Sequence, residues 1–149
     1  MKKSLLAFLI LLFCFNFQGH AQEGNTPQQV QTIRKNTYTK VLELTDAESQ
    51  KFWPIFDEMQ AKLNDIKKQS KIERLNIVQN YSKLTDAQME RALDNLLTLE
   101  QDGLDVKKKY YQKFKKVLPI KKVALLPRAD REFKKELLKI IKGYRDADE

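Results

Sequence analysis

The sequence predicts an all-α domain with four main helices. Apolar residues recur at spacings of three and four over most of the chain, as they do on one face of an α-helix. The segment Leu-Thr-Asp-Ala occurs twice, beginning at Leu44 and at Leu84, and each copy has the residue types that begin a helix. No segment alternates between apolar and polar residues over a useful length, so we expect no strand.

The first 21 residues have the composition of a secretory signal peptide. A basic start at Lys2 and Lys3 precedes a run of apolar residues, and Gly19 and Ala21 place small residues at positions −3 and −1 of a cleavage site after Ala21. The apolar run is short for a membrane anchor, which needs ~20 residues. We therefore expect export and a single mature domain over residues 22–149.

Cleavage after Ala21 removes the only cysteine, Cys14, and the only histidine, His20. The remaining 128 residues hold 26 basic and 20 acidic side chains, a net charge of +6. A disulfide, a thiolate or imidazole metal site, and catalysis by a nucleophile paired with histidine are then excluded. No glycine-rich phosphate-binding loop is present, so we expect neither an enzyme nor a bound metal or cofactor.

The mature chain begins with a polar leader at residues 22–26, which we expect to be disordered. Pro27 suits the first turn of a helix, which carries a modest apolar stripe. The first Leu-Thr-Asp-Ala segment then provides an N-cap at Thr45. Glu48 three residues later completes a capping box behind Leu44, so a second helix is expected to begin there.

The helix after Thr45 contains the aromatic end of the predicted core, with Phe52, Trp53 and Phe56 at helical spacing. Pro54 lies inside this helix and removes one backbone hydrogen bond, so we expect a bend there. The apolar pattern becomes less regular further on. The helix is therefore expected either to continue to Tyr81 or to break near Ser70.

The second capping box, Thr85 and Gln88 behind Leu84, opens the longest predicted helix, which extends to Leu118. Two neighbouring apolar rows run along it. The first row is Met89, Ala92, Leu96, Leu99, Gly103, Val106, Tyr110, Phe114 and Val117, and the second row is Leu93, Leu97, Leu104, Tyr111 and Leu118. We expect the rest of the chain to cover both rows, and Gly103 to allow another helix to approach closely.

Two prolines interrupt the C-terminal part of the chain. Pro119 is expected to begin a helix, and Pro127 either kinks that helix or begins a new one. The last helix has an apolar stripe at Phe133, Leu137, Ile140, Ile141 and Tyr144. Gly143 is expected to end this helix, and residues 145–149 are expected to form a frayed tail.

Two Leu-Thr-x-x-Gln/Glu boxes behind a signal peptide, in a small charged helical chain, resemble the Spy/CpxP family of periplasmic proteins. The second box has the family's Leu-Thr-x-x-Gln motif in full, whereas the first has Glu48 in place of glutamine. Residues 52–55 and 118–124 resemble a Bacteroidetes-type branch, whose members are described as sensors tied to ECF-type sigma factors. The resemblance spans residues 44–141, and Pro127 departs from it because an uninterrupted helix is expected there.

The resemblance implies long antiparallel helices in a bent hairpin, with two copies paired as a cradle-like dimer. It implies a periplasmic location and one of two activities, which are ATP-independent chaperoning of unfolded envelope proteins and regulation of the envelope stress response. The residues of the two boxes are expected to be structural, because they begin helices; they are Leu44, Thr45, Glu48, Leu84, Thr85 and Gln88.

Basic residues are concentrated near the C-terminus. Residues 107–145 hold fifteen lysines and arginines and three acidic residues, a net charge of +12, whereas residues 22–106 hold eleven basic and fourteen acidic residues, a net charge of −3. Part of this charge serves solubility. The rest is expected to attract anionic partners. The candidate client- or partner-binding residues are Lys107, Lys108, Tyr111, Lys115, Lys122, Arg128, Arg131 and Lys135.

Three kinds of partner match this charge. Unfolded or acidic envelope proteins offer acidic and apolar stretches together, and an anionic membrane surface offers lipid head groups. Nucleic acid matches the charge, but export argues against it. The first hypothesis is therefore a chaperone-like or stress-sensing protein. The alternative is a non-chaperone subunit that binds one acidic signalling partner, such as a sensor or anti-sigma protein. A homodimer is expected, because long thin helices leave apolar surface uncovered.

Overall fold

The computed structural model describes residues 27–147, and every regular element in that range is helical. The helices in chain order are α2 (Pro27–Leu42), α3 (Asp46–Gln79), α4 (Asp86–Phe114), α5 (Ile120–Val123) and α6 (Leu126–Ala147). Four of these five helices are long, as the all-α prediction requires. The expected signal peptide, the leader at 22–26 and residues 148–149 lie outside the described residues.

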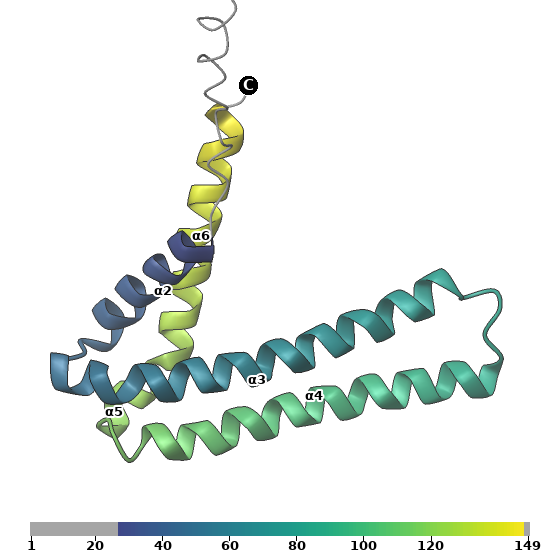
Figure 1. The fold of residues 1–149 in the computed structure, drawn as a ribbon, viewed down its shortest axis with the longest axis horizontal. Helices are drawn as coiled ribbons and strands as arrows, with labels where there is room; N and C mark the ends of the chain where they lie inside the picture. The colour runs from purple at the N-terminus through teal and green to yellow at the C-terminus, as the bar shows by residue number, and fades with distance from the viewer. Residues whose placement is uncertain (1–26, 148–149) are drawn as a thin grey trace, which may run out of the picture.

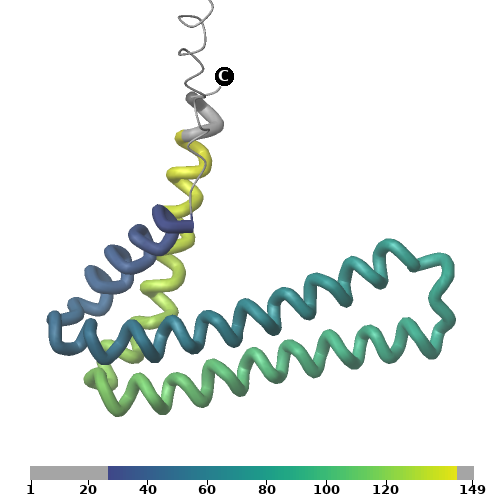
Figure 2. The backbone as a smooth tube through the Cα atoms, viewed as in Figure 1, coloured from purple at the N-terminus to yellow at the C-terminus, as the bar shows by residue number. Residues whose placement is uncertain are grey.

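Helices α3 and α4 form a long antiparallel pair, and α2 and α6 pack against each other at one end of it (Figure 1). The chain runs out along α3, turns at residues 80–85 and returns along α4 (Figure 2). Within the described chain, α2, α5 and α6 reach only the base of this hairpin. The remainder projects from the base (Figure 1). We call residues 63–107 the distal arm; Leu63 and Lys107, where it joins the base, still border a hollow beside α6.

Both predicted capping boxes are present. At the start of α3, the Thr45 hydroxyl accepts a hydrogen bond from the Glu48 backbone N–H (3.3 Å), and the Glu48 carboxylate accepts one from the Thr45 N–H (2.9 Å). Thr85 and Gln88 make the equivalent pair of bonds at the start of α4 (3.4 and 2.9 Å). The repeated sequence therefore marks two equivalent helix starts, each of which satisfies two otherwise unpaired N–H groups.

We expect Thr85→Ala to lower the free energy of unfolding by about 1 kcal/mol, because α4 loses its N-cap acceptor. Thr98→Ala is the matched control. Its hydroxyl lies on the same helix and donates only to the Asp94 carbonyl of the preceding turn (2.9 Å), so its removal should cost little. Urea denaturation followed by circular dichroism measures both values. Equal losses in the two variants would contradict the assigned cap.

Helix α3 passes through Ser70 without a break, so the continuous alternative is correct. It ends at Gln79, where the Asn80 side chain donates to the Asn76 carbonyl (3.2 Å). Pro54 lies inside α3 on its exposed side, where water can reach the carbonyl that lost its donor. Leu84 is half-buried in the loop that leads into α4.

Helix α4 ends at Phe114, four residues before the predicted end, because the chain turns towards Pro119. Pro119 precedes α5 as its N-cap residue, and Pro127 is the second residue of α6. Pro127 therefore begins a new helix and does not kink an existing one. The first N–H groups of a helix have no intrahelical acceptor, so a proline is tolerated at that position.

The prediction that Gly143 ends the last helix is wrong, because α6 continues through it to Ala147. Neither described glycine has a positive φ angle, so Gly143 does not use the conformational freedom that ends helices. The last described turn of α6 includes residues 145–147. The expected frayed tail at 145–149 is therefore helical over the part that the structure describes.

The core lies at the base of the hairpin, where the long helices meet. The Phe52 and Phe114 rings, from α3 and α4, have centroids 5.1 Å apart, and the Tyr38 ring of α2 lies 4.8 Å from that of Phe56. The buried cluster comprises Tyr38, Leu42, Leu44, Phe52, Phe56, Met59, Tyr110, Phe114, Leu118, Val123, Leu126, Ala129 and Phe133. The predicted aromatic end of the core is confirmed.

Candidate partner-binding surface

The second apolar row of α4 is covered only near the base. Leu118 is buried, and Tyr111 is half-buried against the core. In the distal arm, by contrast, the Leu93, Leu97 and Leu104 residues are 52, 64 and 58% exposed. The expectation that the rest of the chain covers both rows is therefore correct for the first row, where Ala92 and Leu96 are buried, and wrong for the second row in the distal arm, because α2 and α6 stop at the base.

Helix α3 adds apolar side chains beside this row. Val78 is exposed near the tip of the hairpin and lies one turn beyond Arg74 on α3, and Tyr81 is exposed in the turn that follows this helix. Arg74 donates to the Glu100 carboxylate (3.1 Å), and Glu100 lies between two of the exposed leucines of α4. This ion pair brings the two rows together. We call the resulting surface the uncovered face; its members are Val78, Tyr81, Leu93, Leu97 and Leu104.

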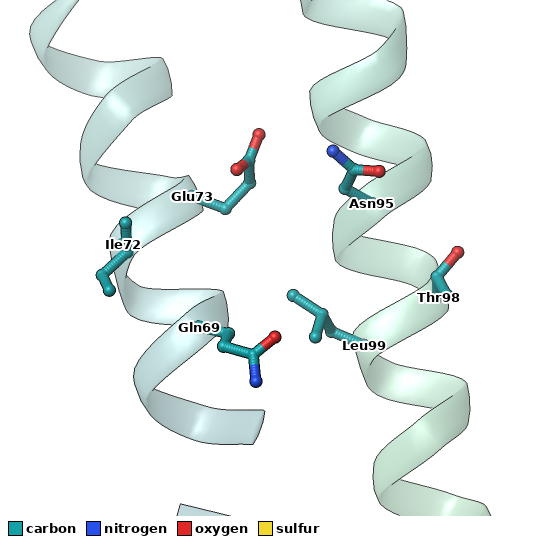
Figure 3. Close-up of a pocket in the computed structure, with 6 residues that line it drawn as sticks. All are labelled: Gln69, Ile72, Glu73, Asn95, Thr98 and Leu99. Carbon is teal, nitrogen blue, oxygen red and sulfur yellow. The ribbon is translucent and has the colours of Figure 1, made fainter. Parts of the chain in front are cut away.

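The seam between α3 and α4 is more polar in the distal arm than at the base. Figure 3 shows Gln69 and Glu73 of α3 and Asn95 and Leu99 of α4 directed into the space between the two helices. These side chains border a cavity of about 360 Å³. Since polar seam residues bury less apolar area than the aromatic rings of the base, the arm is held together less tightly than the base.

A groove runs along the uncovered side of the arm and into the base. One hollow of about 360 Å³ is bordered by Leu63, Lys67, Ser70, Gly103, Leu104 and Lys107. The next hollow, of about 400 Å³, lies between the hairpin and α6 and is bordered by Phe56, Met59, Leu63, Lys107, Leu126 and Pro127. Because Leu63 and Lys107 border both hollows, the two adjoin, and we call them together the arm groove.

Gly103 lies in the arm groove with free space above it. Apart from its chain neighbours and the backbone of its own helix, a methyl group added at its Cα would find no atom within 4 Å. The expectation that Gly103 admits close packing of another helix of this chain is therefore wrong. The physical reason is that α3 and α4 are not in close contact at this point, where the groove opens between them.

The arm groove carries an excess of positive charge. Its two carboxylates are already paired, since Asp130 accepts from Lys134 (2.7 Å) and Glu100 accepts from Arg74 (3.1 Å). Lys67 and Lys107 also border the groove, and neither makes an ion pair or hydrogen bond with any residue that the structure describes. Two ammonium groups are thus left unneutralised beside apolar side chains.

Two tyrosines border the deep end of the groove. The Tyr38 hydroxyl donates to the Asp130 carboxylate (3.4 Å). Burial, and then the charge of Asp130, raise the pKa of both Tyr38 and Tyr111 above the usual range of a phenol. Both hydroxyls therefore keep their protons at neutral pH; that of Tyr38 is used on Asp130, and that of Tyr111 can serve as a hydrogen-bond donor at this end.

The opposite edge of the hairpin has a different charge pattern. A hollow there is bordered by Asp65, Asp102 and Asp105, together with Lys62 and Lys109. The aspartates do not form a metal site, because no group of three acidic, histidine or cysteine side chains within residues 27–147 is arranged to hold an ion. The two edges of the arm therefore differ in charge: this hollow has three acidic and two basic side chains, whereas basic side chains are in excess in the arm groove.

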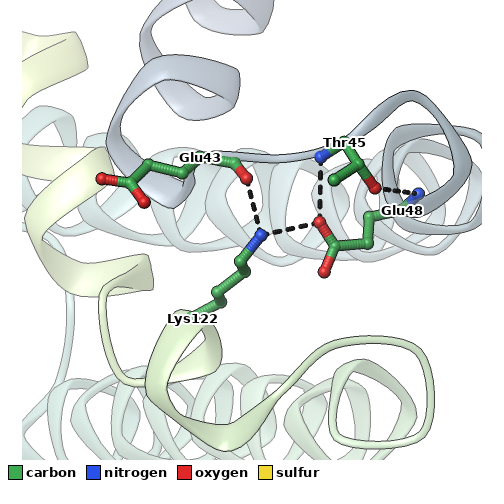
Figure 4. A network of polar contacts seen from close by, with 4 residues as sticks. All are labelled: Glu43, Thr45, Glu48 and Lys122. Atoms are coloured by element: carbon green, nitrogen blue, oxygen red, sulfur yellow. Dashed lines mark hydrogen bonds and ion pairs between the residues drawn. The ribbon is translucent and has the colours of Figure 1, made fainter.

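Lys122 lies apart from the other candidate binding residues. Its ammonium group donates to the Glu48 carboxylate (2.7 Å) and to the Glu43 backbone carbonyl (2.6 Å), as Figure 4 shows. The same carboxylate caps α3, and the hydrogen bond from Lys122 holds the pKa of Glu48 below its usual range. Lys122 thus ties α5 to the junction of α2 and α3, which is a structural role.

The junction that Lys122 holds is conformationally strained. Glu43 has a φ angle of 50°, in the left-handed region that a non-glycine residue rarely adopts. It ends α2 with the paired bonds of a Schellman motif, in which the N–H of Glu43 donates to the Lys40 carbonyl (3.3 Å) and that of Leu44 to the Thr39 carbonyl (3.1 Å). Glu48, where the second box has glutamine, thus both caps α3 and neutralises Lys122.

The remaining candidates do not converge on the groove. Lys108 is exposed on α4 and Lys115 directly after its end. Arg128, Arg131 and Lys135 are exposed along α6, where Lys135 pairs with Glu132 (3.0 Å). Of the eight predicted residues, Lys107 and Tyr111 border the arm groove. Sequence reasoning missed Lys67, which lies in the acidic part of the chain and reaches the groove only through antiparallel pairing of α3 and α4.

Within the described residues, no helix is both long enough and apolar enough to cross a bilayer. Comparison of the chain with models of protein families, with curated proteins and with solved structures gave no match. The similarity to the Spy/CpxP family therefore depends on the sequence motifs described above.

Proposed function

We propose that this protein is an ATP-independent, chaperone-like or stress-sensing protein of the bacterial envelope. In this proposal it binds unfolded or misfolded envelope proteins on the distal arm, as a homodimer, after export and cleavage behind Ala21. It uses no cofactor or metal and catalyses no reaction. The signal-peptide pattern and the two capping boxes of the Spy/CpxP type support the location and the family.

The observation that carries the proposal is the uncovered face. Large apolar side chains that are 52 to 73% exposed follow one another along a projecting arm, and the unpaired Lys67 and Lys107 lie beside them. An unfolded chain presents apolar and acidic stretches in varied order, so it can use both features. Flexible lysines and isolated leucines impose little shape on a ligand, which suits weakly selective binding.

The alternative is a non-chaperone subunit that binds one signalling partner, such as a sensor or anti-sigma protein. The arm groove favours this alternative, because a defined hollow with a fixed arrangement of charges selects a partner better than a flat surface does. Binding to an anionic membrane surface is a third proposal. Exposed Leu138 and Ile141 near the end of the basic helix α6 favour it.

Aggregation assays separate the first two proposals. We expect the exported chain, residues 22–149, to suppress light scattering by two unrelated unfolding proteins at stoichiometric amounts and without nucleotide. High salt should weaken suppression, because exposed ammonium groups are screened. Protection of neither protein would contradict general chaperone activity and leave the single-partner alternative, to be pursued by identifying the envelope protein that co-purifies.

A further inference from the structure

We infer, on the basis of the proposed function, that the arm groove is a docking site for an amphipathic helix of a partner protein. The partner helix carries acidic residues beside its apolar stripe. It lies between α3 and α4 on the uncovered side and completes a three-helix layer in the distal arm. This assignment names the conformation and charge of the ligand, which the proposed function leaves open.

The walls of the groove favour a helical ligand over an extended one. Both walls are α-helices, α3 and α4, whose backbone N–H and C=O groups are already bonded within each helix. An extended segment would find no backbone partners there, and its own polar groups would be buried without hydrogen bonds. A helix satisfies its own backbone groups and presents only side chains to the groove.

The uncovered face supplies the apolar contacts that such a helix needs. Leu97 and Leu104 are two turns apart on α4, and Val78 lies on α3 one turn beyond Arg74, which pairs with Glu100 between the two leucines. An α-helix that buries residues at positions i, i+3, i+4 and i+7 presents a stripe of matching period. At the base, other helices of the chain pack against the α3–α4 hairpin, whereas the uncovered face has no such helix in the described chain, and a partner helix would take that place.

Gly103 gives this missing helix a place to approach. Within the chain it serves neither packing nor a turn, because the space above it is empty and its φ angle is not positive. A glycine in the middle of a helix lowers helix propensity, and this one gains nothing from the rest of the chain in return. Its position on the border of the hollow in the distal arm lets a partner side chain reach the backbone of α4.

Charge determines which amphipathic helix fits. Lys67 stands on the α3 wall and Lys107 on the α4 wall, and both lack partners among the described residues. The two carboxylates of the groove are occupied by Arg74 and Lys134. Acidic side chains that flank the apolar stripe on both sides would meet one free ammonium group on each wall. A basic amphipathic helix would meet like charges instead.

The test uses a fluorescent synthetic peptide of about 18 residues, with a leucine stripe at positions i, i+3, i+4 and i+7 and flanking glutamates, titrated with residues 22–149. We expect saturable binding that K67E/K107E weakens about tenfold or more. The matched control K62E/K109E makes the same charge change on the opposite edge, and should alter affinity less than twofold. A peptide with flanking lysines should regain affinity for K67E/K107E.

Gly103→Leu provides a second, uncharged test. The Cβ of the new side chain has no neighbour within 4 Å, and leucine favours helix more than glycine does, so the folded protein should keep or raise its melting temperature while peptide binding falls about tenfold. Equal losses in K67E/K107E and K62E/K109E, or equal binding of a scrambled peptide of the same composition, would overturn the inference. Self-association of the free chain that K67E/K107E abolishes would overturn it too, in favour of a second copy as the occupant.

The inference and the proposed function fail in different assays. Suppression of aggregation with no specific peptide binding would remove the helix-docking site and leave the chaperone proposal standing. Saturable peptide binding that depends on Lys67 and Lys107, without suppression of aggregation, would instead favour the single-partner subunit.

Discussion

Phe52→Ala is expected to lower the free energy of unfolding by about 3–5 kcal/mol. Phe52 is completely buried at the base of the hairpin, and its ring lies 5.1 Å from the Phe114 ring and 5.0 Å from the Trp53 ring. Its removal leaves a cavity at the point where α3, α4 and the α2–α6 pair meet. Small domains are stable by only about 5–15 kcal/mol, so this change should leave the protein near the limit of folding.

Leu97→Ala is the control for this prediction, since it removes a similar apolar side chain from the distal arm. Leu97 is 64% exposed, so its loss should change the free energy of unfolding by about 0.5 kcal/mol or less. Urea denaturation followed by circular dichroism gives both values under the same conditions. A loss in Leu97→Ala comparable to that in Phe52→Ala would mean that another part of the protein covers the arm.

Lys122→Glu should have the second largest effect, lowering the melting temperature by about 5 °C. The substitution places a carboxylate beside the Glu48 carboxylate and the Glu43 carbonyl, where an ammonium group now bonds to both. Lys121→Glu is the matched control, because it makes the same charge change at the neighbouring residue, whose side chain is exposed. Equal melting temperatures for the two variants would contradict the structural role of Lys122.

The same ion pair predicts a dependence on pH. In the folded protein, the hydrogen bond that Lys122 donates lowers the pKa of the Glu48 carboxyl below its ordinary value of 4.5. The ion pair therefore stabilises the folded protein above about pH 4.5. This contribution is lost as the pH falls through the lower pKa that Glu48 has in the folded protein. Lys122→Met should remove this contribution, so the difference in stability between wild type and variant should shrink on acidification below about pH 4.5.

Local sequence patterns predicted the helices because the determinants of helix starts are local. Thr45 and Thr85 each have their capping partner three residues away, so the boxes could be read without knowing the fold. The end of α2 could not be read in this way. Glu43 adopts a left-handed conformation that usually signals glycine, and a lysine 79 residues later helps to hold it.

The candidate site was less predictable, because it depends on which side of the hairpin the other helices cover. The two rows of α4 were visible in the sequence, but nothing local showed that α2 and α6 stop at the base. The charge of the groove was also concealed. Counting charges along the chain singled out the basic residues 107–145. The groove instead brings Lys107 together with Lys67, which lies in the net acidic segment 22–106.

The protein thus divides into a base that holds the fold and an arm that is free to bind. The base contains the whole buried cluster of the described residues, the strained end of α2 and the ion pair of Lys122. The arm contributes the exposed leucines and the unpaired lysines. Substitutions in the arm should therefore alter binding with little effect on stability, which makes the binding surface open to mutational mapping.

The most direct test of the binding surface is photo-crosslinking during an aggregation assay. A benzophenone amino acid would be placed at residue 104, which borders the arm groove, or at residue 102, which borders the opposite edge. We predict that an unfolding client is captured efficiently from position 104 and only weakly from position 102, two residues away on the same helix. Equal capture from both positions, or stronger capture from 102, would contradict the assignment of the uncovered side as the surface that binds clients.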